Sequence, residues 1–180
     1  MAAKGLIAAL WSVLGLLLPL GYAIWRLSQY TYESLQMSLG PIHWLVLVVF
    51  TLFMAHSEGY RGFQKSFSPR YAARTKYLYS HGTLMQCILA PLFSMGFFHA
   101  PRRRIFSILA LTTMIVFFIL AFRLIPQPWK GLLDAGVVVG LCWGAISTIL
   151  FCLRAFSDAD FCWDAEIEYS NPGNLPSPYQ

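Results

Sequence analysis

The chain alternates between long apolar runs and short polar connections. Four of the runs, at about residues 5–27, 43–58, 105–125 and 132–153, equal or approach the roughly 20 residues that a helix needs to cross a bilayer. A helix satisfies its backbone polar groups internally, as lipid requires of a spanning segment. The pattern predicts an all-α, polytopic (multi-pass) integral membrane bundle, with residues 1–156 forming a single transmembrane domain.

A further apolar segment, residues 83–98, leaves the number of spans open. It is short and contains Gln86 and Pro91, so it is either a fifth span or a re-entrant helix that returns to the same side. With five spans, eight of the 13 lysines and arginines fall on the side of the N-terminus; with four spans and a re-entrant helix, ten do. Re-entrant segments are uncommon, but the positive-inside bias favours them here, and we expect four spans plus this short helix.

Residues 61–80 form a basic segment with interleaved aromatic side chains. The segment holds five cations and no acid, and Ser68–Pro69 predicts the start of a helix because proline suits the first helical position. Such a segment is typical of an amphipathic helix lying flat on the membrane, on the cytoplasmic or equivalent side. Four of its cations are candidate ligands for anionic lipid headgroups: Lys65, Arg70, Arg74 and Lys76.

Composition and charge narrow the class of protein further. Only 12% of the 180 residues are charged, against about 25% in soluble domains. The net charge of +5 suits an anionic bilayer surface, whereas nucleic acid fits poorly with such short loops. None of the four cysteines forms a C-x-x-C pair, so neither a disulfide framework nor structural zinc is expected.

The C-terminal residues 157–180 differ in character from the rest of the chain. They contain five of the eight acids, together with several prolines and a glycine, and the pattern predicts a flexible acidic tail. The alternative is that this tail, which also carries aromatic residues, docks on the chain's own basic segment.

Three glycines in the last apolar run, Gly136, Gly140 and Gly144, form two linked G-x-x-x-G units. Glycines four residues apart line one helix face and let another backbone approach closely. This glycine seam is interpreted either as a helix contact within the chain or as a contact with another membrane protein or a second copy.

A polar cluster at the end of the second run is the candidate site, formed by His56, Glu58, Tyr60 and Arg61 together with His81. Placed at one membrane surface, the two imidazoles and the carboxylate would suit zinc, non-haem iron or one b-type haem. No spacing fixes such ligands within one helix, so no cofactor is required. Glu58 and Arg61, three residues apart, would otherwise form an ion pair, or the cluster would bind an anionic headgroup or polar substrate.

These features predict a non-catalytic accessory, assembly or lipid-interacting component of a membrane protein system. One alternative is a small membrane-embedded metal- or haem-binding enzyme or redox protein that uses His56, Glu58 and His81. The other is a small carrier or oligomeric channel, although the middles of the apolar runs hold few polar groups.

Overall fold

The computed structural model describes residues 2–97 and 124–158, together with positions 106, 109, 113, 117, 120, 121, 161 and 163. Every regular element in this part of the chain is helical. Among the described residues, three helical stretches are long and apolar enough to span a membrane: Lys4–Leu35, Pro41–His81 and Trp129–Ser157. The predicted all-helical fold is confirmed at this level, and it is consistent with an integral membrane protein.

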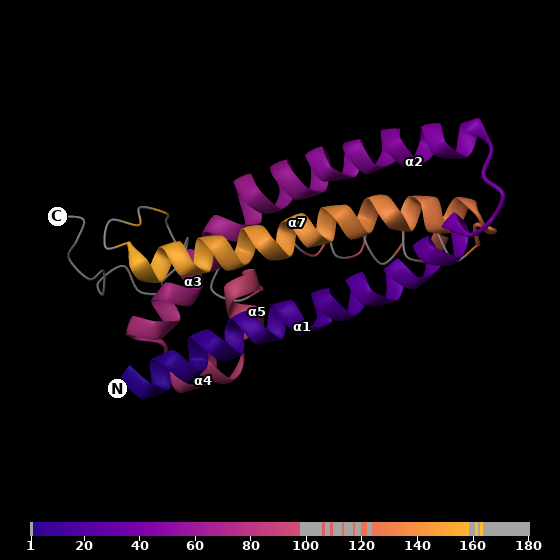
Figure 1. The fold of residues 1–180 in the computed structure, drawn as a ribbon. Helices are drawn as coiled ribbons and strands as arrows, with labels where there is room; N and C mark the ends of the chain where they lie inside the picture. The colour runs from indigo at the N-terminus through magenta and orange to yellow at the C-terminus, as the bar shows by residue number, and fades with distance from the viewer. Residues whose placement is uncertain are drawn as a thin grey trace.

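Two long helices, α1 (Ala2–Leu35) and α7 (Trp129–Ser157), run side by side in opposite directions (Figure 1). α1 continues past the predicted end of the first run at residue 27. Its last turns are held against the start of α7, where the Thr31 hydroxyl donates to the Gly131 carbonyl oxygen at 3.2 Å. The polar residues after the first run therefore extend the helix and do not form a loop.

The second long stretch consists of three segments, α2 (Pro41–Met54), η1 (Ala55–Phe67) and α3 (Ser68–His81). η1 is a π-helix, in which each backbone N–H donates five residues back, as the Ser68 N–H does to the Phe63 oxygen. π-helices usually occur as single turns, often near functional sites, so a run of 13 residues is unusual. The second apolar run, predicted to end near residue 58, thus continues as helix to residue 81.

α3 begins at Ser68, as the Ser68–Pro69 pair predicts. The sequence predicts a separate interfacial helix here, but α3 instead continues the chain from η1 and packs between α1, α5 and α7. Tyr71 and Ala72 of α3 share one core cluster with Leu16 of α1 and Cys152 of α7. Tyr71, one of the aromatic residues that predict an interfacial helix, is used for packing in the structure.

Residues 83–98 do not form one crossing helix in the part of the segment that the structure describes. They form two short helices, α4 (Leu84–Ile88) and α5 (Ala90–Met95), and Gly96 ends α5 with a φ of 92° that suits glycine. Five and six residues rise only about 7 and 9 Å, far less than a bilayer core. Both helices lie beside the first half of α1, where the Trp11 indole donates to the Ile88 oxygen at 3.2 Å.

The predicted span at 105–125 falls mostly outside the described residues. The six positions described between 106 and 121 are all helical. His99 and the three arginines at 102–104 lie outside the described residues. The structure describes the chain again from residue 124. This segment lies at the end of the molecule where α1 ends, as the hydrogen bond from Ser34 to the Gln127 side-chain oxygen at 2.5 Å shows.

At the other end, a group of hydroxyls joins α1, α3 and α5. The buried Ser12 hydroxyl donates to the Ser94 hydroxyl at 2.7 Å and lies 3.3 Å from that of Thr75. The Tyr71 hydroxyl donates to the Ser12 backbone oxygen at 2.7 Å. These four residues, here called the polar junction, hold the short helix α5 against α1 and α3.

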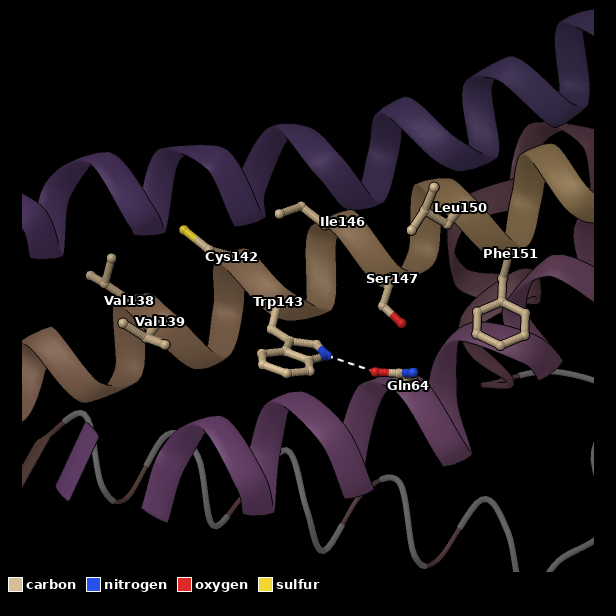
Figure 2. A pocket seen from close by; sticks show the side chains of 9 residues that line it. All are labelled: Gln64, Val138, Val139, Cys142, Trp143, Ile146, Ser147, Leu150 and Phe151. Atoms are coloured by element: carbon tan, nitrogen blue, oxygen red, sulfur yellow. Dashed lines mark hydrogen bonds between the residues drawn. The ribbon is translucent and has the colours of Figure 1, made fainter. Parts of the chain in front are cut away.

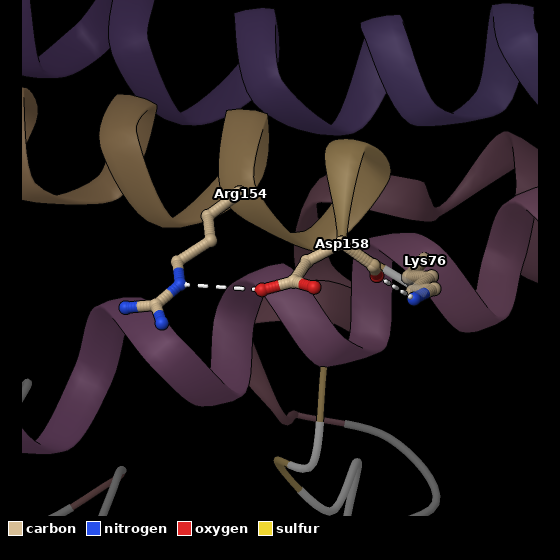
Figure 3. A network of polar contacts seen from close by, with 3 residues as sticks. All are labelled: Lys76, Arg154 and Asp158. Carbon is tan, nitrogen blue, oxygen red and sulfur yellow. Dashed lines mark hydrogen bonds and ion pairs between the residues drawn. The ribbon is translucent and has the colours of Figure 1, made fainter. Parts of the chain in front are cut away.

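The end of α7 contacts α3 through Lys76. The Lys76 ammonium donates to the Asp158 backbone oxygen at 3.0 Å (Figure 3). It also lies 5.7 Å from the ring centre of Phe161. Arg154 and Asp158 form an exposed ion pair at 3.7 Å. Asp158 and Phe161 therefore lie near Lys76. Most of the tail lies outside the described residues, so both its flexibility and its docking on the basic segment stay predictions.

Candidate functional site

The glycine seam faces α2 and η1 of the same chain. Gly136, Gly140 and Gly144 are buried, and a Cβ atom added to each would lie 2.6 Å from Phe50, 2.9 Å from Glu58 and 2.5 Å from Phe63. Real Cβ atoms do not approach so closely, so a larger residue at any of these positions would force the facing side chain to move. The seam is filled from within the chain, as the intramolecular interpretation expects, and a partner would have to use another surface.

Glu58 points to this seam and lacks the partner that the sequence suggests. One of its carboxylate oxygens, Oε2, is buried and has no hydrogen-bond partner among the described residues. The predicted ion pair with Arg61 does not form, and Arg61 is exposed. The physical reason is the π-helix, in which a turn closes at the fifth residue and so carries the third residue away from the same face.

His56, Tyr60, Arg61 and Lys65 form the polar edge of η1. The rings of His56 and Tyr60 lie 5.7 Å apart, and the Lys65 ammonium lies 4.7 Å from the Tyr60 ring centre. The members of these pairs are four and five residues apart in the sequence, the spacing at which side chains are neighbours on a π-helix. His56, Arg61 and Lys65 are all exposed. Four of the five predicted site residues, Glu58 included, are thus on one π-helix, with Glu58 turned inward.

His81 is not part of this group. It ends α3 and stacks on Tyr77 with 5.4 Å between ring centres. The 14 residues of α3 rise about 21 Å, so they separate His81 widely from η1. No three His, Cys, Asp or Glu side chains in the described part of the chain are grouped to hold a metal ion. The expectation that His56 and His81 share one surface is therefore wrong, because a continuous helix replaces the expected loop.

The predicted headgroup ligands separate into exposed and engaged side chains. Lys65 is exposed, whereas Arg74 is only 2% exposed and donates to the Phe93 carbonyl oxygen at 2.9 Å. Arg70 donates to the Ser66 carbonyl oxygen at 2.7 Å, and Lys76 is bound to the end of α7. Arg74 is a core residue and is not accessible to a lipid headgroup, which corrects the prediction for this cation.

The sequence does not reveal a cavity of about 520 Å³ beside α7. One wall of the cavity is a stripe of α7 between Val138 and Phe151, and Gln64 of η1 lies on the other side (Figure 2). The Trp143 indole N–H donates to the Gln64 side-chain oxygen at 2.8 Å across the two helices. The only trace of the cavity in the sequence is that apolar residues recur every four positions on α7. This spacing indicates one face of a helix but does not indicate a cavity beside it.

Comparisons of the chain with models of known protein families, with curated proteins and with solved structures find no match. The function is therefore argued from the geometry of η1, α7 and the elements packed against them.

Proposed function

We propose that the chain is a non-catalytic accessory or assembly component of a membrane protein system, and that a partner protein contacts it along the polar edge of η1. The observation that carries the proposal is the position of this edge along α7. Glu58 lies at Gly140, Phe63 lies at Gly144, and Gln64 is bonded to Trp143. Arg61 and its neighbours are therefore level with residues 140–144 of α7.

Residues 135–153 of α7 are free of charge and flanked by Asp134 and Arg154. These 19 residues rise about 28 Å, close to the thickness of the hydrocarbon core, and we take them as the span of α7. Their centre is Gly144. The polar edge then lies near the middle of the bilayer, and not at its surface.

A lysine or arginine at the centre of a spanning helix costs about 2.5–3.5 kcal/mol, and such residues usually face protein or water. Arg61 and Lys65 are exposed in this chain. Contact with acidic or polar groups of a partner would remove the cost and would supply specificity. An accessory component needs such a contact and needs no catalytic group, so this function suits η1 better than the enzyme alternative does.

We also infer a topology of four spans with a re-entrant helix. The start of α1 and the end of α7 lie at one end of the molecule, and the backbone of Gly5 meets that of Tyr79 near the end of α3 (Figure 1). α4 and α5 stay beside the first half of α1. A span at 105–125 would then return the chain to the far end before α7. Lys4, Lys76 and Arg154 share the first end, which the positive-inside rule places in the cytoplasm or its equivalent.

The partner contact is tested by photo-crosslinking in the native membrane. A photoreactive amino acid is placed at Gly62, which is exposed and directly follows Arg61 in η1, and in a control at Leu52 of α2, which is 66% exposed. We expect a protein adduct from position 62 and none from position 52. Arg61→Ala with Lys65→Ala should reduce the adduct at least about tenfold, because the partner's charges would lose their counterparts.

The same experiment can contradict the proposal. If position 62 yields no protein adduct, or if the double alanine variant yields as much adduct as the original chain, the edge is not a charge-dependent partner contact. An adduct between two copies of this chain would identify the partner as the chain itself, the arrangement that the oligomeric channel alternative requires.

A further inference from the structure

The cavity beside α7 lies on a surface separate from the polar edge and has the character of a ligand site. Ligand sites in proteins are mostly apolar, measure about 300–1,000 Å³ and hold a few polar groups that orient the ligand. This cavity measures about 520 Å³. Its apolar wall includes Ile146 and Leu150, which are 59% and 60% exposed, so the cavity opens sideways from the bundle toward the surrounding lipid.

The Ser147 hydroxyl is the unusual group in this wall. Helical serines and threonines in apolar surroundings normally donate to the carbonyl four residues back. Thr148 does so to the Gly144 oxygen at 2.8 Å, and Ser57 does so to the Phe53 oxygen at 2.8 Å. Ser147 is only 5% exposed, yet its hydroxyl has no partner among the described residues. A buried hydroxyl without a partner is unfavourable, and a ligand would supply the missing bond.

Gln64 provides a second donor on the opposite wall. Its side-chain oxygen accepts the hydrogen bond from Trp143, which fixes the orientation of the amide. In Figure 2 the Ser147 hydroxyl points from α7 toward η1, and the Gln64 amide lies below it with its nitrogen turned toward Phe151. The two side chains thus offer an O–H and an N–H₂ group on facing sides of an apolar space.

We infer that this cavity binds a neutral, ring-shaped carbonyl compound dissolved in the membrane, of the isoprenoid quinone class. A carbonyl oxygen would accept from Ser147 and Gln64, and the Trp143 and Phe151 rings would flank a flat ring. None of the described residues that line the cavity is charged, which disfavours an anionic ligand. Ser147 is three residues from Gly144, the centre of the uncharged stretch, whereas phospholipid ester groups lie at the bilayer surface.

The test is equilibrium binding to the full chain, purified in mild detergent and measured by native mass spectrometry. One probe is a benzoquinone with a decyl tail, and the comparison probe is the same tail on a benzene ring without carbonyls. We expect the quinone to bind at least about tenfold more tightly, because only the quinone carries acceptors for the two donors. Ser147→Ala should weaken quinone binding two- to tenfold, a range of about one lost hydrogen bond, and should leave the second probe unchanged.

Two further variants keep the result interpretable. Ser57→Ala removes a hydroxyl that donates to the Phe53 oxygen four residues back and lies outside the cavity, so this variant should bind the quinone as the original chain does. Ile146→Trp should fill the cavity and abolish binding of both probes. Equal binding of the two probes would mean that any apolar chain, such as a lipid acyl chain, occupies the cavity, and this would overturn the inference. Loss of quinone binding in Ser57→Ala to the same extent as in Ser147→Ala, or no binding to the original chain, would overturn it as well.

Discussion

The polar junction and the glycine seam join different sets of helices by different means. At the polar junction, α1, α3 and α5 are held by buried hydroxyls, with Ser12 bonded to Ser94 at 2.7 Å and contacted by Tyr71. Along the seam, α7 meets α2 and η1 through glycines covered by Phe50, Glu58 and Phe63. The first contact depends on hydrogen-bond partners and the second on the absence of side-chain volume. The two regions should therefore respond to different substitutions.

The largest effect we expect is in the labelling of cysteines at the two ends of the molecule, where each position should be labelled from one side of the membrane only. In a background with the native cysteines replaced by alanine, single cysteines are introduced by Lys4→Cys, Arg103→Cys and Lys130→Cys. A membrane-impermeant thiol reagent should label positions 4 and 103 from one side of the membrane and position 130 from the other. Position 103 labelled together with position 130 would mean that residues 83–98 cross the bilayer, which contradicts the proposed topology.

The next effect concerns the seam. Gly144→Ala should destabilise the protein by about 1–3 kcal/mol, because the added Cβ would lie 2.5 Å from the Phe63 ring and would force the helices apart. Gly21→Ala is the matched control, since a Cβ there has nothing within 4 Å. It should be neutral or up to about 1 kcal/mol more stable, as alanine favours the helix. Unfolding by sodium dodecyl sulfate in mixed micelles measures both, and equal stabilities would show that the seam is not tightly packed.

The smallest effect concerns the polar junction. Ser12→Ala should cost about 1 kcal/mol, because single hydrogen bonds between helices in membranes contribute modestly and Thr75 keeps its bond to the Tyr71 oxygen. Ser57→Ala, which removes a hydroxyl bonded only within its own helix, should change stability by less. The same unfolding titration compares the two. A cost above that of Gly144→Ala would reverse the proposed ranking of the two contacts.

The sequence predicts the helices better than it predicts what joins them. The apolar runs are visible because lipid-facing helices need such residues throughout, and Ser68–Pro69 places the start of α3 correctly. The stretch from Gly59 to Phe67, between the predicted end of the second run and the helix start at Ser68–Pro69, reads as a loop because it is polar. In the structure it stays helical because the small residues of α7, Gly140 among them, leave room for it.

The positions of the candidate residues show the same difference between local and long-range contacts. Four of its five residues are neighbours in sequence and stay together on η1, whereas His81 depended on a turn that does not form. Arg74 counted as a surface cation because its partner, the Phe93 oxygen, lies on a short helix that sequence patterns do not place. The cavity depends on the distance between α7 and η1, which no local pattern of residues encodes.

The π-helical winding of η1 has a mechanical consequence for the bundle. A π-helix advances less along its axis per residue than an α-helix does, and its side chains follow each other at a different angle. The winding therefore sets both the separation and the relative rotation of α2 and α3. Phe50 is fixed at one end by the seam and Tyr71 at the other by Ser12. Any rewinding of η1 would have to slide or turn one of these anchors, so the two contacts are coupled through the pitch of a single segment.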